Sequence, residues 1–207
     1  PPIFLEGLFP DELLDRVVEG CPGTDDPAWG RFDNAHEKKL GNYRRLADAP
    51  EPIPRFLAAL NGPEMLAFLE ALTGIEGLMP DPYFGGGALH QIVRDGFLKV
   101  HADFNWHPKL RLDRRLNVLI YLNRDWKAEY GGALELWDAS MKGPEKSVLP
   151  AFNRTVVFST TDFSYHGQPP PLAGPEGVTR KSVTPSYAPD GTPDTATTAA
   201  PHTTPPP

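Results

Sequence analysis

Two histidines and an aspartate lie close together in KVHADFNWHP, residues 99–108. His101 and Asp103 are separated by one residue, so on a β-strand their side chains would point to the same face. An imidazole and a carboxylate side by side can coordinate one divalent metal ion. A His-x-Asp pair also arises by chance in many chains of this size, where it is more often a hydrogen-bonded surface pair. The pair therefore needs a third ligand before it predicts a metal site.

His166 is the candidate third ligand, in TTDFSYHGQPP after the apolar run NRTVVFS. Two histidines and one carboxylate on one face of an octahedron leave three positions open, as in non-haem Fe(II) oxygenases. Arg180 follows in TRKSV and would lie on the last strand near His166. A buried arginine needs an anion, and a dicarboxylate cosubstrate would supply one. A zinc hydrolase can use the same three ligands but has no need of that anion anchor.

The elements that must position these residues fall into two halves. Residues 9–20 predict a helix, and residues 53–74 predict two helices broken at Asn61-Gly62-Pro63 that pack on one face of a sheet. We interpret residues 21–50 mostly as loop. From residue 87 onward, short apolar or alternating runs are bounded by Gly, Pro and Asp. They are ALHQIVRD, GFLKVHADF, RLNVLIYLN, GALELWD, SVLPAF, NRTVVFS and VTRKSV. Their spacing indicates an antiparallel sandwich or barrel of seven or eight strands.

Composition excludes several classes of protein. The net charge is −7, and the best basic patch, RLDRR, is interrupted by Asp113, which argues against nucleic-acid binding. No apolar run reaches the roughly 18 residues of a membrane span, and the first residues lack the features of a signal peptide. Cys21 is the only cysteine, which rules out an intrachain disulfide framework and a multi-thiolate metal site. We therefore expect a cytoplasmic protein.

Three longer stretches carry a family resemblance: HADFNWHP, RRLNVLIYLNRDWKAEYGGALELWD and NRTVVFSTTDFSYHGQPPPLAGPEGVTRKS. Over about residues 87–184 the chain resembles the 2-oxoglutarate/Fe(II)-dependent dioxygenases of the prolyl-4-hydroxylase-like group. It is similar in particular to animal oxygen-sensing prolyl hydroxylases and their bacterial relatives. The resemblance implies an α+β, mainly β fold: a double-stranded β-helix (jelly-roll or cupin-like) core with the N-terminal helices packed on one sheet. It also implies Fe(II), 2-oxoglutarate and O2, with ascorbate as a candidate reductant.

The resemblance gives the site residues their expected roles. His101, Asp103 and His166 match the iron ligands, and Arg180 matches the residue that binds the distal carboxylate of 2-oxoglutarate. Ser182 and Tyr121 are expected to share that carboxylate. Gln91 stands where the animal enzymes carry a tyrosine that contacts the cosubstrate. The expected substrate contacts are Phe104, Trp106, Arg94 and His90, whereas we expect His107 to face solvent.

The domain is expected to span residues 1–184, with a helical part over about 1–80 and the jelly-roll core over about 87–184. Pro185 removes a backbone donor, which ends the last strand or confines it to an edge. Residues 185–207 are rich in Pro, Thr and Ala and are expected to form a tail outside the core.

The expected activity is oxidation of an unactivated C–H bond, by hydroxylation or oxidative cyclisation, with succinate and CO2 as coproducts. We favour a small polar natural product as substrate, containing amines or sugars as in antibiotic biosynthesis, because acidic walls around the site would suit such a molecule. A peptidyl prolyl hydroxylase acting on a protein is the alternative. A non-catalytic metal-binding jelly-roll domain is a third interpretation, and neither a nucleic acid nor a membrane is expected as a partner.

Overall fold

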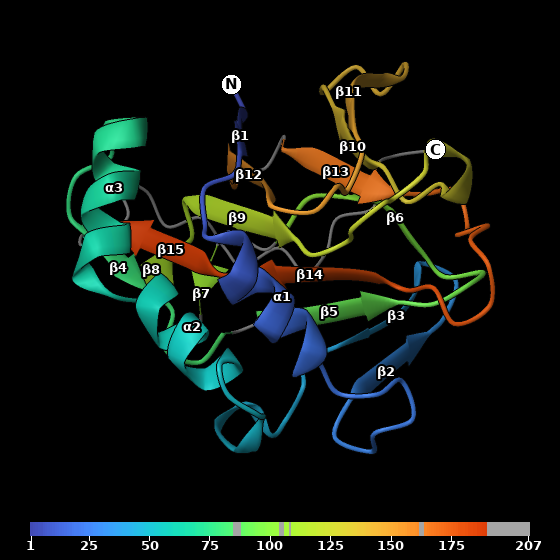
Figure 1. The fold of residues 1–207 in the computed structure, drawn as a ribbon. Helices are drawn as coiled ribbons and strands as arrows, with labels where there is room; N and C mark the ends of the chain where they lie inside the picture. Colours follow the sequence, from blue (N-terminus) through green and yellow to red (C-terminus); the bar gives the residue numbers. More distant parts are fainter. Residues whose placement is uncertain (85–87, 104–105, 108, 162–163, 190–207) are drawn as a thin grey trace.

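A computed structural model describes residues 1–84, 88–103, 106–107, 109–161 and 164–189 (Figure 1). The helices are α1 (Asp11–Glu19), α2 (Ile53–Leu60) and α3 (Pro63–Thr73), with 3-10 turns at Leu46–Asp48 and Ala128–Tyr130. The strands before the predicted core are β1 (Ile3–Glu6), β2 (Gly30–Asp33), β3 (Glu37–Gly41) and β4 (Leu78–Pro80). Those that follow are β5 (Ala88–Ile92), β6 (Phe97–His101), β7 (Trp106–His107), β8 (Leu112–Asp113), β9 (Leu116–Tyr121), β10 (Leu134–Trp137), β11 (Pro144–Val148), β12 (Arg154–Ser159), β13 (Tyr165–Gln168), β14 (Arg180–Thr184) and β15 (Ser186–Pro189).

Thirteen of the described strands form one antiparallel sheet that curls into two layers, and β7 and β8 pair with each other in a separate two-stranded sheet. The order of the large sheet is β1-β12-β9-β14-β5-β3-β6-β13-β10-β11, with β2 paired to β3 and β15 paired to β9 and β4. β3 joins the layers, because Leu40 pairs with Gln91 of β5 while Glu37 pairs with Leu98 of β6. This confirms the mainly β, double-stranded β-helix fold expected from the sequence.

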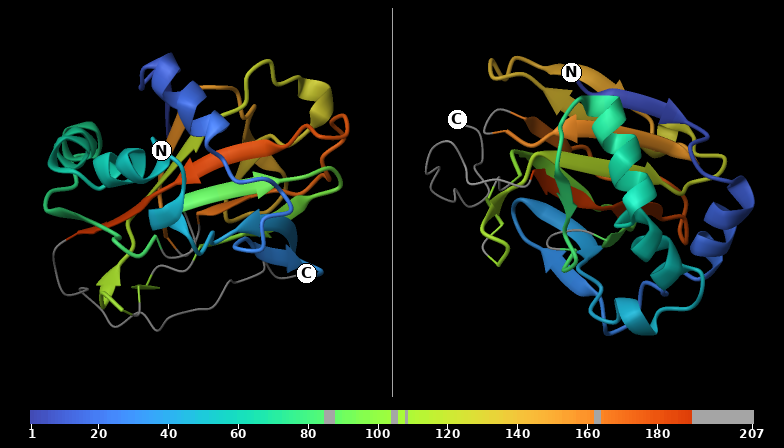
Figure 2. Two further views of the ribbon diagram at one scale, coloured as in Figure 1. Left: turned by 60° about the horizontal axis from the view of Figure 1, so that its bottom comes forward. Right: turned by 90° about the vertical axis from the view of Figure 1, so that its left-hand side faces the viewer.

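The three helices cover one layer of the sheet, as Figures 1 and 2 show. Leu14 of α1, Phe56 of α2 and Leu69 of α3 belong to the same buried cluster as Val118 of β9 and Val183 of β14. The amphipathic spacing of these helices therefore places their apolar faces on the sheet, as expected.

Strand β9 separates the helices from the interior between the two layers. All six of its residues are buried. Val118 and Ile120 contact the helix side, whereas Leu119 and Tyr121 belong to a second cluster with Leu134 of β10. The unbroken apolar run NVLIYL thus reflects a strand that is covered on both faces.

The structure corrects several sequence-based boundaries. Residues 21–50 were expected to be loop, but they contain the β2–β3 hairpin. The expected strand SVLPAF is displaced, because β11 ends at Val148. His166 lies within a short strand of its own, β13, and does not simply follow β12.

The expected tail begins too early. Pro185 does end β14, but β15 then pairs with both β9 and β4, and Tyr187 is only 1% exposed. Residues 186–189 are therefore part of the sheet. The rest of the expected tail, residues 190–207, lies outside the described residues.

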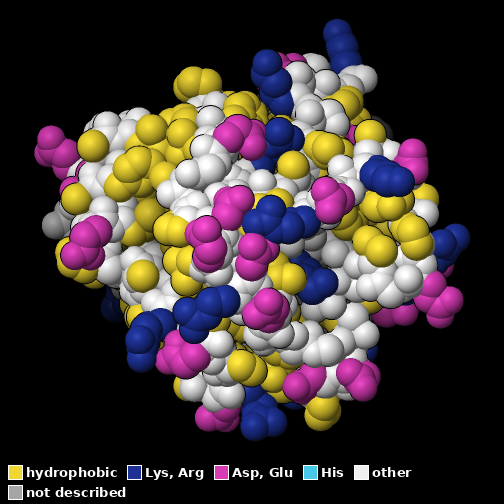
Figure 3. Space-filling view, viewed as in Figure 1, with side chains coloured by type: hydrophobic (Ala, Val, Ile, Leu, Met, Phe, Trp, Pro, Cys, Tyr) yellow, Lys and Arg dark blue, Asp and Glu magenta, His cyan; other side chains and the backbone are white. Residues whose placement is uncertain are grey.

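The outer surface fits the composition. On the face drawn in Figure 3, Lys and Arg side chains are interspersed with Asp and Glu and form no continuous basic stripe. Within the part of the chain that the structure describes, no helix has the length and apolar character needed to cross a bilayer.

Candidate active site

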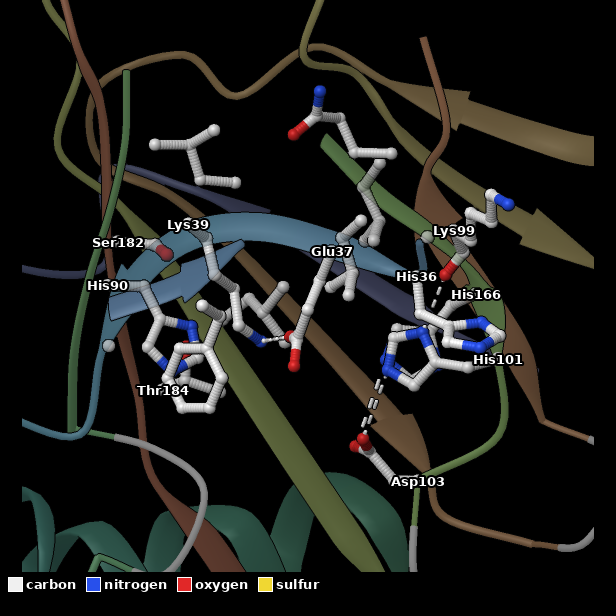
Figure 4. Close-up of a pocket in the computed structure, with 18 of the residues that line it drawn as sticks. His36, Glu37, Lys39, His90, Lys99, His101, Asp103, His166, Ser182 and Thr184 are labelled. Carbon is white, nitrogen blue, oxygen red and sulfur yellow. Dashed lines mark hydrogen bonds and ion pairs between the residues drawn. The ribbon is translucent and has the colours of Figure 1, made fainter. Parts of the chain in front are cut away.

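His101, Asp103 and His166 come together at the end of β6 and on β13. His101 and His166 are directly opposite each other in the antiparallel pairing, and their ring centroids are 4.6 Å apart. The Asp103 carboxylate lies 3.4 Å from Nε2 of His101 and 3.7 Å from Nε2 of His166. One ligand atom from each residue lies within 4.8 Å of the others, which is the spacing of a three-ligand metal site (Figure 4).

Both imidazoles are oriented by their own backbone. Nδ1 of His101 lies 2.9 Å from the carbonyl of Lys99, and Nδ1 of His166 lies 3.1 Å from the carbonyl of Ser164. A proton on Nδ1 donated to these carbonyls places the lone pair of each imidazole on Nε2, the atom that faces the Asp103 carboxylate.

Asn117 orients the carboxylate. Its side-chain amide on β9 donates a hydrogen bond of 2.6 Å to Oδ2 of Asp103. The sequence analysis missed this residue, because only the pairing of β9 within the sheet brings it beside Asp103, 14 positions earlier in the chain.

The electrostatics favour the protonation states that bind metal. Burial works to raise the pKa of the Asp103 carboxyl, but His166 and His101, together with Arg114, hold that pKa well below its usual range. Burial lowers the pKa of His166 to about 4, although Asp103 opposes the shift. At neutral pH the cluster therefore contains an ionised carboxylate and a neutral His166 imidazole.

Arg180 lies buried on β14 and is 5% exposed. Its Nε donates to the carbonyl of Gly132 at 2.7 Å, and a terminal nitrogen donates to the Tyr121 hydroxyl at 3.3 Å. Burial raises the pKa of Tyr121, so the phenol stays protonated beside the guanidinium. These two hydrogen bonds thus fix the orientation of the Arg180 guanidinium at the cavity wall.

One cavity of about 370 Å³ contacts both the His101–Asp103–His166 cluster and Arg180. Among the described residues, its charged lining consists of the carboxylates Glu37 and Asp103 and the basic side chains Lys39, Lys99, Arg114 and Arg180. The expectation of acidic walls is therefore wrong for the described lining, in which basic side chains outnumber carboxylates.

Some predicted contacts do line this cavity. Ser182 and His90 are among its walls, with Thr184 beside them. Tyr121 is fully buried and reaches Arg180 from behind the cavity wall.

Others do not. Gln91 follows His90 on β5 and therefore points to the opposite face, where its amide donates to Thr179. Arg94 binds the carbonyl of Gly174, and neither Arg94 nor Trp106 is among the described residues that line the cavity. Phe104 lies outside the described residues.

His107 corrects another expectation, because it is buried and does not face solvent. Its Nε2 lies 3.4 Å from Oδ2 of Asp81, and its ring stacks on Tyr83 at a centroid distance of 6.2 Å. Its Nδ1 accepts a hydrogen bond from the Leu110 amide. These contacts hold His107 in the protein interior, four residues after Asp103.

A comparison with protein families matches residues 87–186 to the 2OG-Fe(II) oxygenase superfamily. This β-rich region of the chain belongs to the 2OG-Fe(II) oxygenase superfamily. It is accordingly an enzyme, and its cofactors are Fe(II), 2-oxoglutarate and O2. No curated protein sequence gives a significant match.

Solved structures of 2OG-Fe(II) oxygenases share the fold. A prolyl-4-hydroxylase from Pseudomonas putida is 18% identical, with a TM-score of 0.65 over 92% of this chain and 93% of the other. A prolyl hydroxylase from Trichoplax adhaerens, in complex with a hypoxia inducible factor peptide fragment, is 18% identical, with a TM-score of 0.60 over 90% and 83%. HygX from Streptomyces hygroscopicus, with nickel, 2-oxoglutarate and hygromycin B bound, is 15% identical, with a TM-score of 0.56 over 91% and 83%. The prolyl-4-hydroxylase-like fold is thus confirmed.

The residues present fit the cofactors of this superfamily. Two imidazole nitrogens and one ionised carboxylate form the donor set that suits Fe(II), and their Nδ1 atoms and Asp103 Oδ2 already have orienting partners. The buried guanidinium of Arg180 supplies a fixed cation for a carboxylate in the same cavity.

Proposed function

We propose that the enzyme hydroxylates an unactivated C–H bond of a small polar molecule in this cavity. The balanced reaction converts substrate, O2 and 2-oxoglutarate into the alcohol, succinate and CO2. When bound, Fe(II) supplies the redox chemistry of that reaction. The observation that carries the proposal is the single cavity that contacts both the three-residue cluster and buried Arg180.

The protein's residues divide the work between binding and orientation. His101, Asp103 and His166 hold the metal, and Asn117 keeps the carboxylate aligned. Arg180, supported by Tyr121, binds the distal carboxylate of 2-oxoglutarate, with Ser182 beside it on the same strand face. The walls of the cavity around them position the substrate against the reacting atoms.

The size of the cavity favours a small substrate. At about 370 Å³ it is near the lower end of the range for ligand pockets, roughly 300–1,000 Å³, and it must also hold 2-oxoglutarate. Because its lining is not acidic, the amine-rich or sugar-rich class expected from net charge loses its main support.

A peptidyl prolyl hydroxylase is the second candidate. The segment before β5 exposes large apolar side chains, with Met79 40% and Tyr83 56% exposed. An exposed aromatic ring is a surface on which a proline-containing peptide can dock. Succinate formation in the presence of a peptide with blocked ends would favour this candidate over the small molecule.

The deciding experiment is an anaerobic titration with Fe(II) and 2-oxoglutarate, following the visible charge-transfer band of the chelate. We expect the wild type to show the band. Arg180→Ala should weaken 2-oxoglutarate binding about 30-fold or more, since a partner of a buried charge pair is lost, with little change in Fe(II) affinity.

The matched control is Arg124→Ala. Arg124 is half-exposed and pairs with Asp15 on the surface, so its loss should change neither affinity. Iron binding without a band in the wild type would instead favour the non-catalytic metal-binding domain. Equal losses of iron and 2-oxoglutarate in Arg180→Ala would mean that Arg180 acts on the structure.

A further inference from the structure

An ion pair lies inside the cavity and belongs to neither the metal cluster nor the Arg180 end. Nζ of Lys39 is 2.9 Å from Oε2 of Glu37, and the two side chains are only 14% and 18% exposed. Both residues are on β3 two positions apart, so the pleat directs both toward the cavity.

This pair does not hold two elements of the fold together, because both partners belong to one strand. β3 is already fixed by other contacts: Leu40 is buried in the core, and the Asn34 side chain accepts hydrogen bonds from the His36 and Glu37 amides. Withdrawing two charges from water also carries a desolvation cost that their attraction offsets only in part. A role in ligand binding explains the pair better than a role in stability.

The pair lies on the wall of the cavity between its two ends. Figure 4 shows Lys39 and Glu37 between His90, Ser182 and Thr184 on one side and His101 and His166 on the other. The pair and the His101–Asp103–His166 cluster line the same cavity, so a molecule that fills this cavity can meet both.

The adjacent Lys39 ammonium and Glu37 carboxylate favour a ligand that carries both a negative and a positive group. A ligand with only cationic groups would satisfy Glu37 but would face the Lys39 ammonium, and a ligand with only anionic groups would face the Glu37 carboxylate. A ligand that presents a carboxylate and an ammonium on one carbon satisfies both heads at once. The basic lining of the rest of the cavity, including Arg114, also disfavours a polycation.

We propose that the substrate is a free amino acid, with its α-carboxylate bound by Lys39, its α-ammonium bound by Glu37, and its side chain directed toward the metal ligands. The inference rests on the proposed function and narrows its substrate class. The interior of a peptide chain lacks both charges, so a blocked peptide should not bind.

The test measures binding by calorimetry, without turnover, to protein loaded with Ni(II) and 2-oxoglutarate. The probes are the twenty standard free L-amino acids, and each one that binds is compared with its methyl ester and its N-acetyl derivative. At least one free amino acid should bind, and each derivative should bind about 30-fold more weakly or worse, because one buried charge then loses its partner.

Variants assign each charge to its partner. Lys39→Met should weaken binding of the free amino acid and abolish the protein's preference for the free acid over the methyl ester. Lys39→Arg should restore part of that preference. Glu37→Gln should abolish the preference over the N-acetyl derivative. Glu6→Gln, which removes a surface pair with Arg154, is the matched control and should change nothing.

The outcomes separate this inference from the proposed function. Normal binding of 2-oxoglutarate with no binding of any free amino acid would overturn the inference and leave the proposed function standing. Esters that bind as well as the free acids would overturn it too. Failure to bind 2-oxoglutarate at all would overturn the proposed function itself.

Discussion

Asp103 and its partner Asn117 show how single residues prepare this site. The 2.6 Å hydrogen bond from Asn117 fixes one carboxylate oxygen, so the other faces His101. A ligand held in this way loses less conformational entropy when a metal binds.

We predict that Asn117→Ala lowers Fe(II) affinity about 10- to 100-fold, the usual effect of losing a group that orients a metal ligand. Asp103→Ala should lower it further and abolish succinate formation, since a ligand itself is lost. Metal titration of both variants measures the difference.

Asn123→Ala provides the control for general destabilisation. Asn123 is buried and binds the backbone of Pro150 and Lys181, and it does not line the cavity. Its loss should lower the unfolding free energy without changing metal affinity. If Asn117→Ala behaves in the same way as this control, Asn117 acts only in packing.

At the scale of elements, the spacing between β6 and β13 determines whether the two candidate ligands His101 and His166 meet. Gly167 follows His166, and an added Cβ would lie 2.8 Å from the Val100 amide nitrogen and 2.9 Å from the Leu98 carbonyl oxygen. Only a residue without a side chain allows β13 to approach β6 this closely. The register shift between His166 and Gln168 lies at the same place.

Gly167→Ala should therefore separate the strands and move His166 away from His101. We predict a loss of about 1–3 kcal/mol in unfolding free energy from overpacking, together with weaker Fe(II) binding. Denaturant titration and metal titration measure the two effects. Gly143→Ala, where an added Cβ meets nothing within 4 Å, should change neither. Unaltered metal affinity in Gly167→Ala would show that the strands tolerate the extra methyl group.

At the scale of the whole molecule, β15 connects the end of the described chain to the helical layer. The Tyr187 hydroxyl donates a 2.7 Å hydrogen bond to the carbonyl of Leu60, the last residue of α2. A helix leaves its last carbonyls without partners inside the helix, so this bond satisfies a buried acceptor. The segment expected to be a tail thus contributes to the core.

Tyr187→Phe keeps the packing but leaves that carbonyl without its donor. We predict a loss of about 1–3 kcal/mol in unfolding free energy, measured by denaturant titration, with Fe(II) affinity unchanged. Tyr83→Phe is the control, because Tyr83 is 56% exposed and should leave stability nearly unchanged. Equal stability of Tyr187→Phe and the wild type would mean that water replaces the hydroxyl.

Local patterns in the sequence determined the helices, most of the core strands and the chemistry-bearing residues. The Asn-Gly-Pro break separates α2 from α3 as predicted, and the apolar run of β9 is a buried strand. His101 and Asp103 stand two residues apart, a spacing that a short segment shows by itself, whereas His166 and Arg180 are predicted to join them because longer stretches of the chain resemble a known family.

Tertiary structure alone decided which other residues meet them. The sequence of β3, EKKLG, resembles a charged loop because the face that this strand presents to the cavity is polar. The sequence of β13, YHGQ, shows no alternation of apolar residues that would predict a strand. Pairing between distant strands brings Asn117 to Asp103 and places Glu37 and Lys39 over the cavity. Net charge could not predict the lining either, since folding distributes charges by register and not by composition.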